Sequence, residues 1–146
     1  MEVLQVTGQI RCVEIPLRSG RFEPIYGLQS GYLFTWRRKY PTVNSITCEE
    51  SPAAKKGNKG NRYLKIHLQE EIKEKHFDSW KFVHRLIIMM FPDICGHFDL
   101  FRTQADHING LKRDNRAENL RTVTPSENMK ARFALRKQKI TTFINH

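Results

Sequence analysis

The stretch that decides the fold reads ADHINGLKRDNRAENLRTVTPSENMKAR and covers residues 105–132. Two short runs that favour β-structure, 103–107 and 120–124, flank a polar loop. Asn109-Gly110 lies at the start of that loop and is a typical turn pair. The stretch therefore predicts two strands joined by a polar loop.

A helix is predicted directly after the second strand. Thr124 can cap it, because its hydroxyl can accept a hydrogen bond from the first turn. Pro125 suits the first helical position, and Glu127 completes a capping box with Thr124. We expect the helix to run to about residue 137, which gives the order strand, loop, strand, helix.

Three side chains of this stretch suit the hydrolysis of a phosphodiester. Asp106 and Asn128 offer hard oxygen ligands, which Mg²⁺ and Mn²⁺ prefer, and two protein ligands leave room for water and substrate oxygens. A neutral His107 imidazole can take a proton from water near pH 7. Because neighbouring strand side chains point to opposite faces, Asp106 and His107 need a bend at the strand end to serve one site.

Each residue alone has a simpler structural interpretation. An Asp-His pair means little, and Asn115 or Asn119 could simply cap loop amides. The functional interpretation depends on their ordered combination.

That combination resembles the pattern of phage and intron-encoded HNH endonucleases. The matching elements are DHING, DNR, ENLR and SEN, at residues 106–110, 114–116, 118–121 and 126–128. Upstream, VHRL at 83–86 with Phe91-Pro92 resembles the helix that precedes the motif in the same family. The resemblance covers roughly residues 80–130.

The resemblance implies a ββα-metal fold with one divalent ion, Mg²⁺ or Mn²⁺, at each site. Asp106 and Asn128 would be the metal ligands and His107 the general base. Asn119 would bridge the loop and orient the histidine. The chain would thus be an H-N-N variant, similar to nicking homing endonucleases that cut with a single metal. We expect Asn115 to shape the loop, and His84 to pack against the motif.

Zinc is not expected, because the cysteines are far apart. Cys12, Cys48 and Cys95 never form a C-x-x-C pair, so a zinc ribbon is excluded. We expect free thiols buried in the protein.

The charge balance indicates a polyanionic partner. The chain has 25 Lys and Arg residues against 15 Asp and Glu, a net charge of +10 and a pI near 9.8. Basic side chains that neutralise phosphates release condensed counterions, so the charge favours a nucleic acid somewhat over a merely soluble basic protein, with an anionic membrane surface as a weaker option. With the resemblance added, the expected partner is double-stranded DNA. The residues expected to contact DNA are Arg37, Arg38, Lys39, Lys55, Lys56, Lys59, Arg62, Arg116, Arg121, Lys130 and Arg132.

The whole chain is predicted to be an α+β protein. Residues 1–76 form a β-rich, basic region that we expect to contact DNA, and 77–146 form the nuclease region with the ββα motif at about 103–138. A half-buried strand is predicted over 62–69, and a packing helix over 77–91 that Pro92 ends.

No membrane association is expected, because the longest strongly apolar stretch is too short for a bilayer and the N-terminus lacks a signal peptide pattern. The expected location is the cytoplasm, by resemblance that of a bacteriophage host.

Three functions follow from these patterns. The first is a metal-dependent HNH endonuclease that nicks DNA, or that cuts both strands as a homodimer. The second is a non-catalytic DNA-binding protein on the same scaffold. The third is a phage factor directed at a host protein.

Overall fold

The structure is a computed structural model that describes residues 9–37, 40–51, 62–74, 81–99, 103–130 and 133–134. The side chains of residues 37 and 40–42 lie outside this description. Within the described part of the chain, no helix is long and apolar enough to cross a membrane.

The N-terminal part is a four-stranded antiparallel sheet, which confirms the β-rich region predicted there. Its strands are β1 (Arg11–Pro16), β2 (Phe22–Gly27), β3 (Leu33–Arg37) and β4 (Tyr40–Ser45), paired in sequence order. Apolar residues on alternate positions, such as Ile15 and Ile25, are fully buried on one face. The sheet therefore has a clear inner side that packs on the rest of the molecule.

The segment between the sheet and the motif differs from its prediction at two points. β6 (Leu64–Ile66) pairs with β5 (Cys48–Glu50) and is shorter than the strand predicted over 62–69. The packing helix α1 (Val83–Met90) begins later than residue 77, because Phe82 is extended and forms a bridge to Lys65. Residues 77–80 lie outside the described part.

α1 ends before Pro92, and Pro92 begins a second helix. The backbone of Phe91, with φ −124° and ψ 56°, breaks the helical path after α1. Pro92 then occupies the first turn of α2 (Pro92–Cys95), where its missing N–H costs nothing. The prediction that the packing helix ends before Pro92 is therefore confirmed, and the sequence did not suggest the second helix that follows at once.

The predicted strand, loop, strand and helix are all present. β7 (Gln104–His107) pairs antiparallel with β8 (Leu120–Val123), and the turn η2 (Ala117–Asn119) leads into β8. A helix covers residues 125–130. Its capping box is formed: the Thr124 amide donates to Glu127 Oε2 at 3.1 Å, and the Glu127 amide donates to Thr124 Oγ1 at 3.2 Å.

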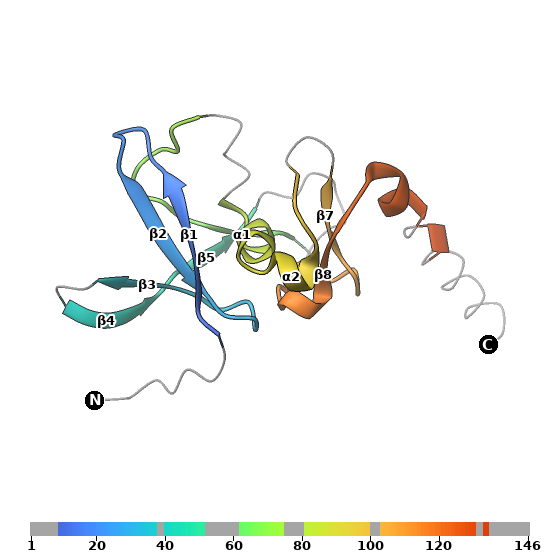
Figure 1. Cartoon of the computed structure of the whole chain (residues 1–146), viewed down its shortest axis with the longest axis horizontal. Coiled ribbons are helices and arrows are strands. Elements are labelled where there is room, and N and C mark those ends of the chain that lie inside the picture. Colours follow the sequence, from blue (N-terminus) through green and yellow to red (C-terminus); the bar gives the residue numbers. More distant parts are fainter. Residues whose placement is uncertain are drawn as a thin grey trace.

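A single hydrophobic core joins the sheet to the motif. Ile15 and Leu33 from the sheet pack in one cluster with Leu86 of α1 and Leu120 of β8. Figure 1 shows α1 in the middle of the molecule, between the N-terminal sheet and the β7–β8 pair. Burying each such side chain stabilises the fold by about 1.5–3 kcal/mol. The motif is thus anchored from beneath by α1.

The three cysteines are free, but only one is buried. Cys95 lies in the core, where its thiol donates to the Ala117 carbonyl oxygen at 3.3 Å and burial raises its pKa to about 11. Cys12 and Cys48 are exposed, so the expectation of three buried thiols was wrong for these two. Cys12 lies at an exposed position of β1, and Cys48 lies on β5, in which every residue is exposed.

Candidate active site

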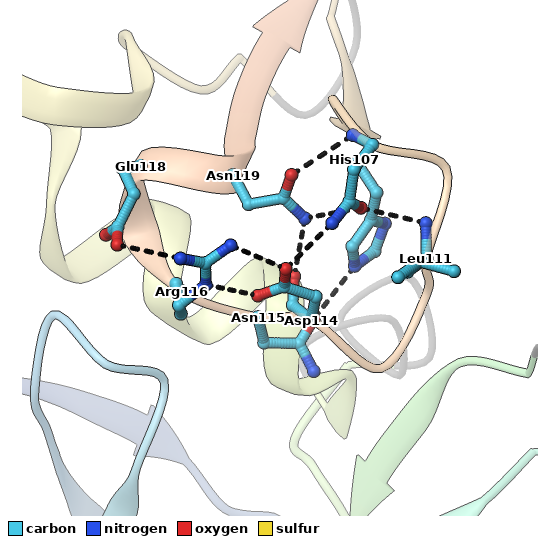
Figure 2. Close-up of polar contacts among 8 residues, drawn as sticks. His107, Leu111, Asp114, Asn115, Arg116, Glu118 and Asn119 are labelled. Carbon is cyan, nitrogen blue, oxygen red and sulfur yellow. Dashed lines mark hydrogen bonds and ion pairs between the residues drawn. The ribbon is translucent and has the colours of Figure 1, made fainter.

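The residue at the centre of the site is His107, the last residue of β7. The residue is 6% exposed, and its Nε2–H donates to Asn115 Oδ1 over 2.8 Å, as Figure 2 shows. An amide oxygen can only accept, so the proton of a neutral ring must sit on Nε2. Nδ1 then carries the lone pair and is the basic atom of the ring.

Burial keeps this imidazole neutral. Desolvation lowers the pKa of His107 below its usual value, while the Asn115 hydrogen bond and the charges of Asp106 and Asp114 act in the opposite direction. The ring is therefore uncharged at neutral pH and able to accept a proton.

An aromatic wall lies against the His107 ring. The ring centroids of His84 and Tyr63 are 5.1 Å and 5.9 Å from that of His107, and 4.9 Å from each other. Lys112 Nζ lies 4.6 Å from the Tyr63 ring centroid. His84 packs against the motif, in the place that the sequence suggested. Nothing in the sequence pattern identified Tyr63, which is far upstream and reaches the site only through the fold.

His84 lies in an environment that disfavours its charged form. Burial lowers its pKa to about 3, with further contributions from the nearby His107 and Arg85. Its Nδ1 is buried without a hydrogen-bond partner among the described residues. His84 is thus neutral at physiological pH and stacks as an aromatic ring rather than as a cation.

The loop between β7 and β8 is braced by Asn119. Its side chain accepts from the Asn109 amide at 3.1 Å and donates to Asn109 Oδ1 at 2.9 Å and to the Asp114 carbonyl oxygen at 2.8 Å. Arg116 adds two bonds to the Asp114 carboxylate, of 2.7 and 2.8 Å (Figure 2). Asn119 therefore ties the two ends of the loop together. Of the two asparagines, Asn115 makes the side-chain hydrogen bond to the His107 ring, and Asn119 bonds Asn109 and Asp114 instead.

Asp106 and Asn128 lie on the same face of the β7–β8 pair. Asn128 Nδ2 donates to Gln104 Oε1 at 2.9 Å, and Gln104 shares a face with Asp106 because strand side chains alternate. Asp106 pairs across the strands with Arg121, whose Nε donates to Asp106 Oδ2 at 2.9 Å. In this structure the Asp106 carboxylate, which the sequence suggested as a metal ligand, is therefore paired with the positively charged Arg121 guanidinium.

The donor set on this face fits a hard divalent cation. Asn128 is 8% exposed, and its Oδ1 is buried without a hydrogen-bond partner among the described residues. A buried, unpaired amide oxygen is costly unless something else satisfies it. Asp106 already holds a positive group. Within the part of the chain that the structure describes, no three His, Cys, Asp or Glu side chains are grouped so that they could hold a metal ion.

The basic residues expected to contact DNA fall into three groups. Lys130 is exposed in the last described full turn of the C-terminal helix. Arg116 and Arg121 are paired with carboxylates, and Arg62 is half-buried, with an Nε that has no partner among the described residues. The following lie outside the described side chains: Arg37, Arg38, Lys39, Lys55, Lys56, Lys59 and Arg132.

Comparison with known proteins agrees with this geometry. Residues 103–130 match the family model of the HNH endonucleases. The fold is similar to a solved structure described as DNA binding and cleavage by the HNH homing endonuclease I-HmuI, with a TM-score of 0.51 and 20% sequence identity. The similarity covers 83% of this chain, which spans 62% of that one. Comparison with curated protein sequences gives no significant match.

The matched segment contains both strands of the ββα motif, with His107 at the end of β7, the loop between the strands, and Asn128. The resemblance to the HNH endonuclease family deduced from the sequence is therefore confirmed over residues 103–130.

Proposed function

We propose that this protein is a metal-dependent HNH endonuclease that hydrolyses DNA phosphodiester bonds. The observation that carries the proposal is the state of His107: a buried, neutral ring whose Nε2–H is held by Asn115 at 2.8 Å. That arrangement leaves Nδ1 as a base of fixed direction at the end of a strand. Asp106 is the preceding residue, and its negative charge acts to raise the pKa of His107.

The step assigned to His107 is removal of a proton from the attacking water. The Nδ1 lone pair accepts that proton, and the imidazolium that forms keeps its Nε2–H bond to Asn115. The Asp106 carboxylate raises the proton affinity of the ring, so it stabilises this charged form. The aromatic wall of Tyr63 and His84 restricts the ring to one orientation.

Asp106 and Asn128 are the residues that would hold a single Mg²⁺ or Mn²⁺ ion. When bound, the ion would stabilise the negative charge on the phosphate and on the departing 3′ oxygen. Arg121 would have to leave Asp106, and its guanidinium would then be free to contact a phosphate oxygen.

Double-stranded DNA is the substrate that the charge supports. The net charge of +10 favours a polyanion, and the similar I-HmuI structure is described as binding and cleaving DNA. We assign the DNA-contacting role to the exposed Lys130, to Arg62, Arg116 and Arg121, and to the basic residues outside the described part.

The test is conversion of supercoiled plasmid in Mg²⁺ or Mn²⁺. We expect nicked product, with linear product appearing only if the protein dimerises. His107→Ala should lower the rate by at least about a hundredfold, because a general base is lost. His67→Ala is the matched control, since His67 is 77% exposed and pairs only loosely with Glu49 at 3.9 Å. Intact plasmid in both metals, or normal cutting by His107→Ala, would refute the proposal.

A second candidate is a DNA-binding protein without cleavage. The Asp106–Arg121 ion pair favours it, because a carboxylate neutralised by arginine is already satisfied without a metal. Its signature would be salt-dependent DNA binding, unchanged in Asp106→Asn, with no product in the plasmid assay.

A further inference from the structure

The turn between β2 and β3 contacts the segment between β7 and β8, although the two are far apart in the sequence. This segment follows His107 and contains Asn115. The turn is closed by the Gly31 amide, which donates to the Leu28 carbonyl oxygen at 2.9 Å. From it, the Gln29 carbonyl oxygen accepts from the Ala117 amide at 2.8 Å. This backbone hydrogen bond links the N-terminal sheet to Ala117, which lies two residues after Asn115 in the chain.

Gly31 brings the turn against Asn115 itself. Its φ is +91°, a conformation that side chains other than glycine rarely adopt. A Cβ at this position would lie 2.7 Å from the Asn115 carbonyl oxygen and 2.8 Å from its carbonyl carbon. Both are main-chain atoms, so any side chain at position 31 would push the Asn115 backbone away.

Asn115 is therefore held from both sides. On one side, Asn119 Nδ2 bonds the Asp114 carbonyl oxygen at 2.8 Å. On the other, the Gln29 carbonyl oxygen holds the Ala117 amide. Between these two attachments the Asn115 side chain, in a residue only 5% exposed, reaches the His107 ring.

We propose that the turn at residues 28–31 is a positioning element of the active site, which sets the backbone of Asn115 so that its amide oxygen fixes the tautomer and direction of His107. This inference rests on the proposed function, because the catalytic use of His107 is part of that proposal. It gives the N-terminal sheet a part in catalysis besides any contact with DNA. Gly31 and Gln29 act through Asn115 and touch no reacting atom.

The experiment compares Gly31→Ala with Gly20→Ala. Gly20 also has φ +91°, but a Cβ there would meet nothing within 4 Å. Both substitutions therefore carry the same backbone strain, and only Gly31→Ala presses on Asn115. Nitrogen-15 NMR of the histidine rings, with His107 assigned by His107→Gln, reports the tautomer of His107 in the full-length protein.

We expect Gly20→Ala to leave the His107 ring signals unchanged. Gly31→Ala should move them towards a mixture of tautomers, as should Asn115→Ala. In plasmid nicking, Gly31→Ala should lower kcat at least about tenfold with little change in KM, since a misplaced base loses rate rather than binding. Added to Asn115→Ala, Gly31→Ala should have no further effect on the His107 signals.

The inference is overturned if Gly31→Ala and Gly20→Ala give the same His107 signals. Should Gly31→Ala fail to fold, hydrogen exchange in the unaltered protein decides: protection of the Ala117 amide supports the contact, and exchange at the rate of an exposed amide overturns it. The NMR signals do not depend on cleavage. A protein that shows the tautomer shift but never cuts DNA would therefore refute the proposed function and leave the positioning role intact.

Discussion

Arg121 makes a contact that its place in the sequence did not suggest. It was expected to contact DNA, yet its guanidinium lies on Asp106, its direct partner across β7 and β8. A cation must displace it to reach the carboxylate. We predict that Arg121→Gln binds Mn²⁺ about tenfold more tightly without DNA, because a unit positive charge beside the ion is removed. Titration calorimetry measures this.

The control for that measurement is Arg18→Gln. Arg18 pairs with Glu71 on the surface, and both side chains are about three-quarters exposed. The control substitution therefore removes one positive charge at a different place on the protein. Equal Mn²⁺ affinity in Arg121→Gln and the unaltered protein would contradict the prediction. Loss of binding in Asp106→Asn would still place the ion on that carboxylate.

His107 should give the pH profile of cleavage its acidic limb. Because burial lowers the pKa of His107 below 6.5, the base is already deprotonated at neutral pH, and the rate should fall only as the pH drops below that value. The Asn115 hydrogen bond raises this pKa, so Asn115→Ala should move the limb to lower pH while reducing the plateau rate. Nicking rates between pH 4.5 and 8 test both shifts; a limb that moves to higher pH would contradict the assignment.

The residues of the motif were predictable, but their partners were not. Asp106, His107 and Asn128 have recognisable spacing along the chain. The contact between Asn115 and His107 depends on how the loop folds back, and Tyr63 arrives from a separate strand. No local pattern records either contact.

At the level of elements, the prediction was correct where all the residues that determine an element lie close together in the sequence. The capping box after β8 could be predicted from the sequence because both of its hydrogen bonds lie within four residues. The start of α1 was not, because Phe82 is drawn into a bridge with Lys65, and a distant strand overrides the helical periodicity. Pro92 was ambiguous, since proline suits the first turn of a new helix as well as the end of an old one.

α1 carries a pH-dependent destabilisation through His84. Its pKa is about 3 in the folded protein and near 6.5 when unfolded, so the unfolded state binds the proton first as the pH falls. Stability should therefore be complete above pH 6.5 and decline below it, by about 2 kcal/mol at pH 5. His84→Phe keeps an aromatic ring at this position but removes the group that binds a proton. Urea unfolding at pH 7 and pH 5 should show a smaller loss for this variant; an equal loss would place the effect elsewhere.

At the scale of the whole molecule, the division at residue 76 remains a prediction about function rather than about folding. The sequence suggested it because basic and β-rich composition gives way to the motif. Composition does not reveal that Ile15 and Leu33 bury their side chains in the same cluster as Leu120. Nor does it reveal that the β2–β3 turn meets the His107 loop. Both are contacts between distant parts of the chain, which only the assembled core defines.

A shared core predicts that damage to the sheet spreads to the motif. Ile15 is fully buried in β1, and Ile15→Ala should cost about 2–5 kcal/mol through lost packing and the cavity left behind. Because the core is continuous, unfolding should stay a single transition, and hydrogen exchange should accelerate at the Leu120 and Val123 amides as much as in β1. Val43→Ala is the control, since Val43 lies in the same sheet but is 39% exposed. Unchanged protection in β8 while β1 loosens would show instead that the sheet and the motif fold as separate units.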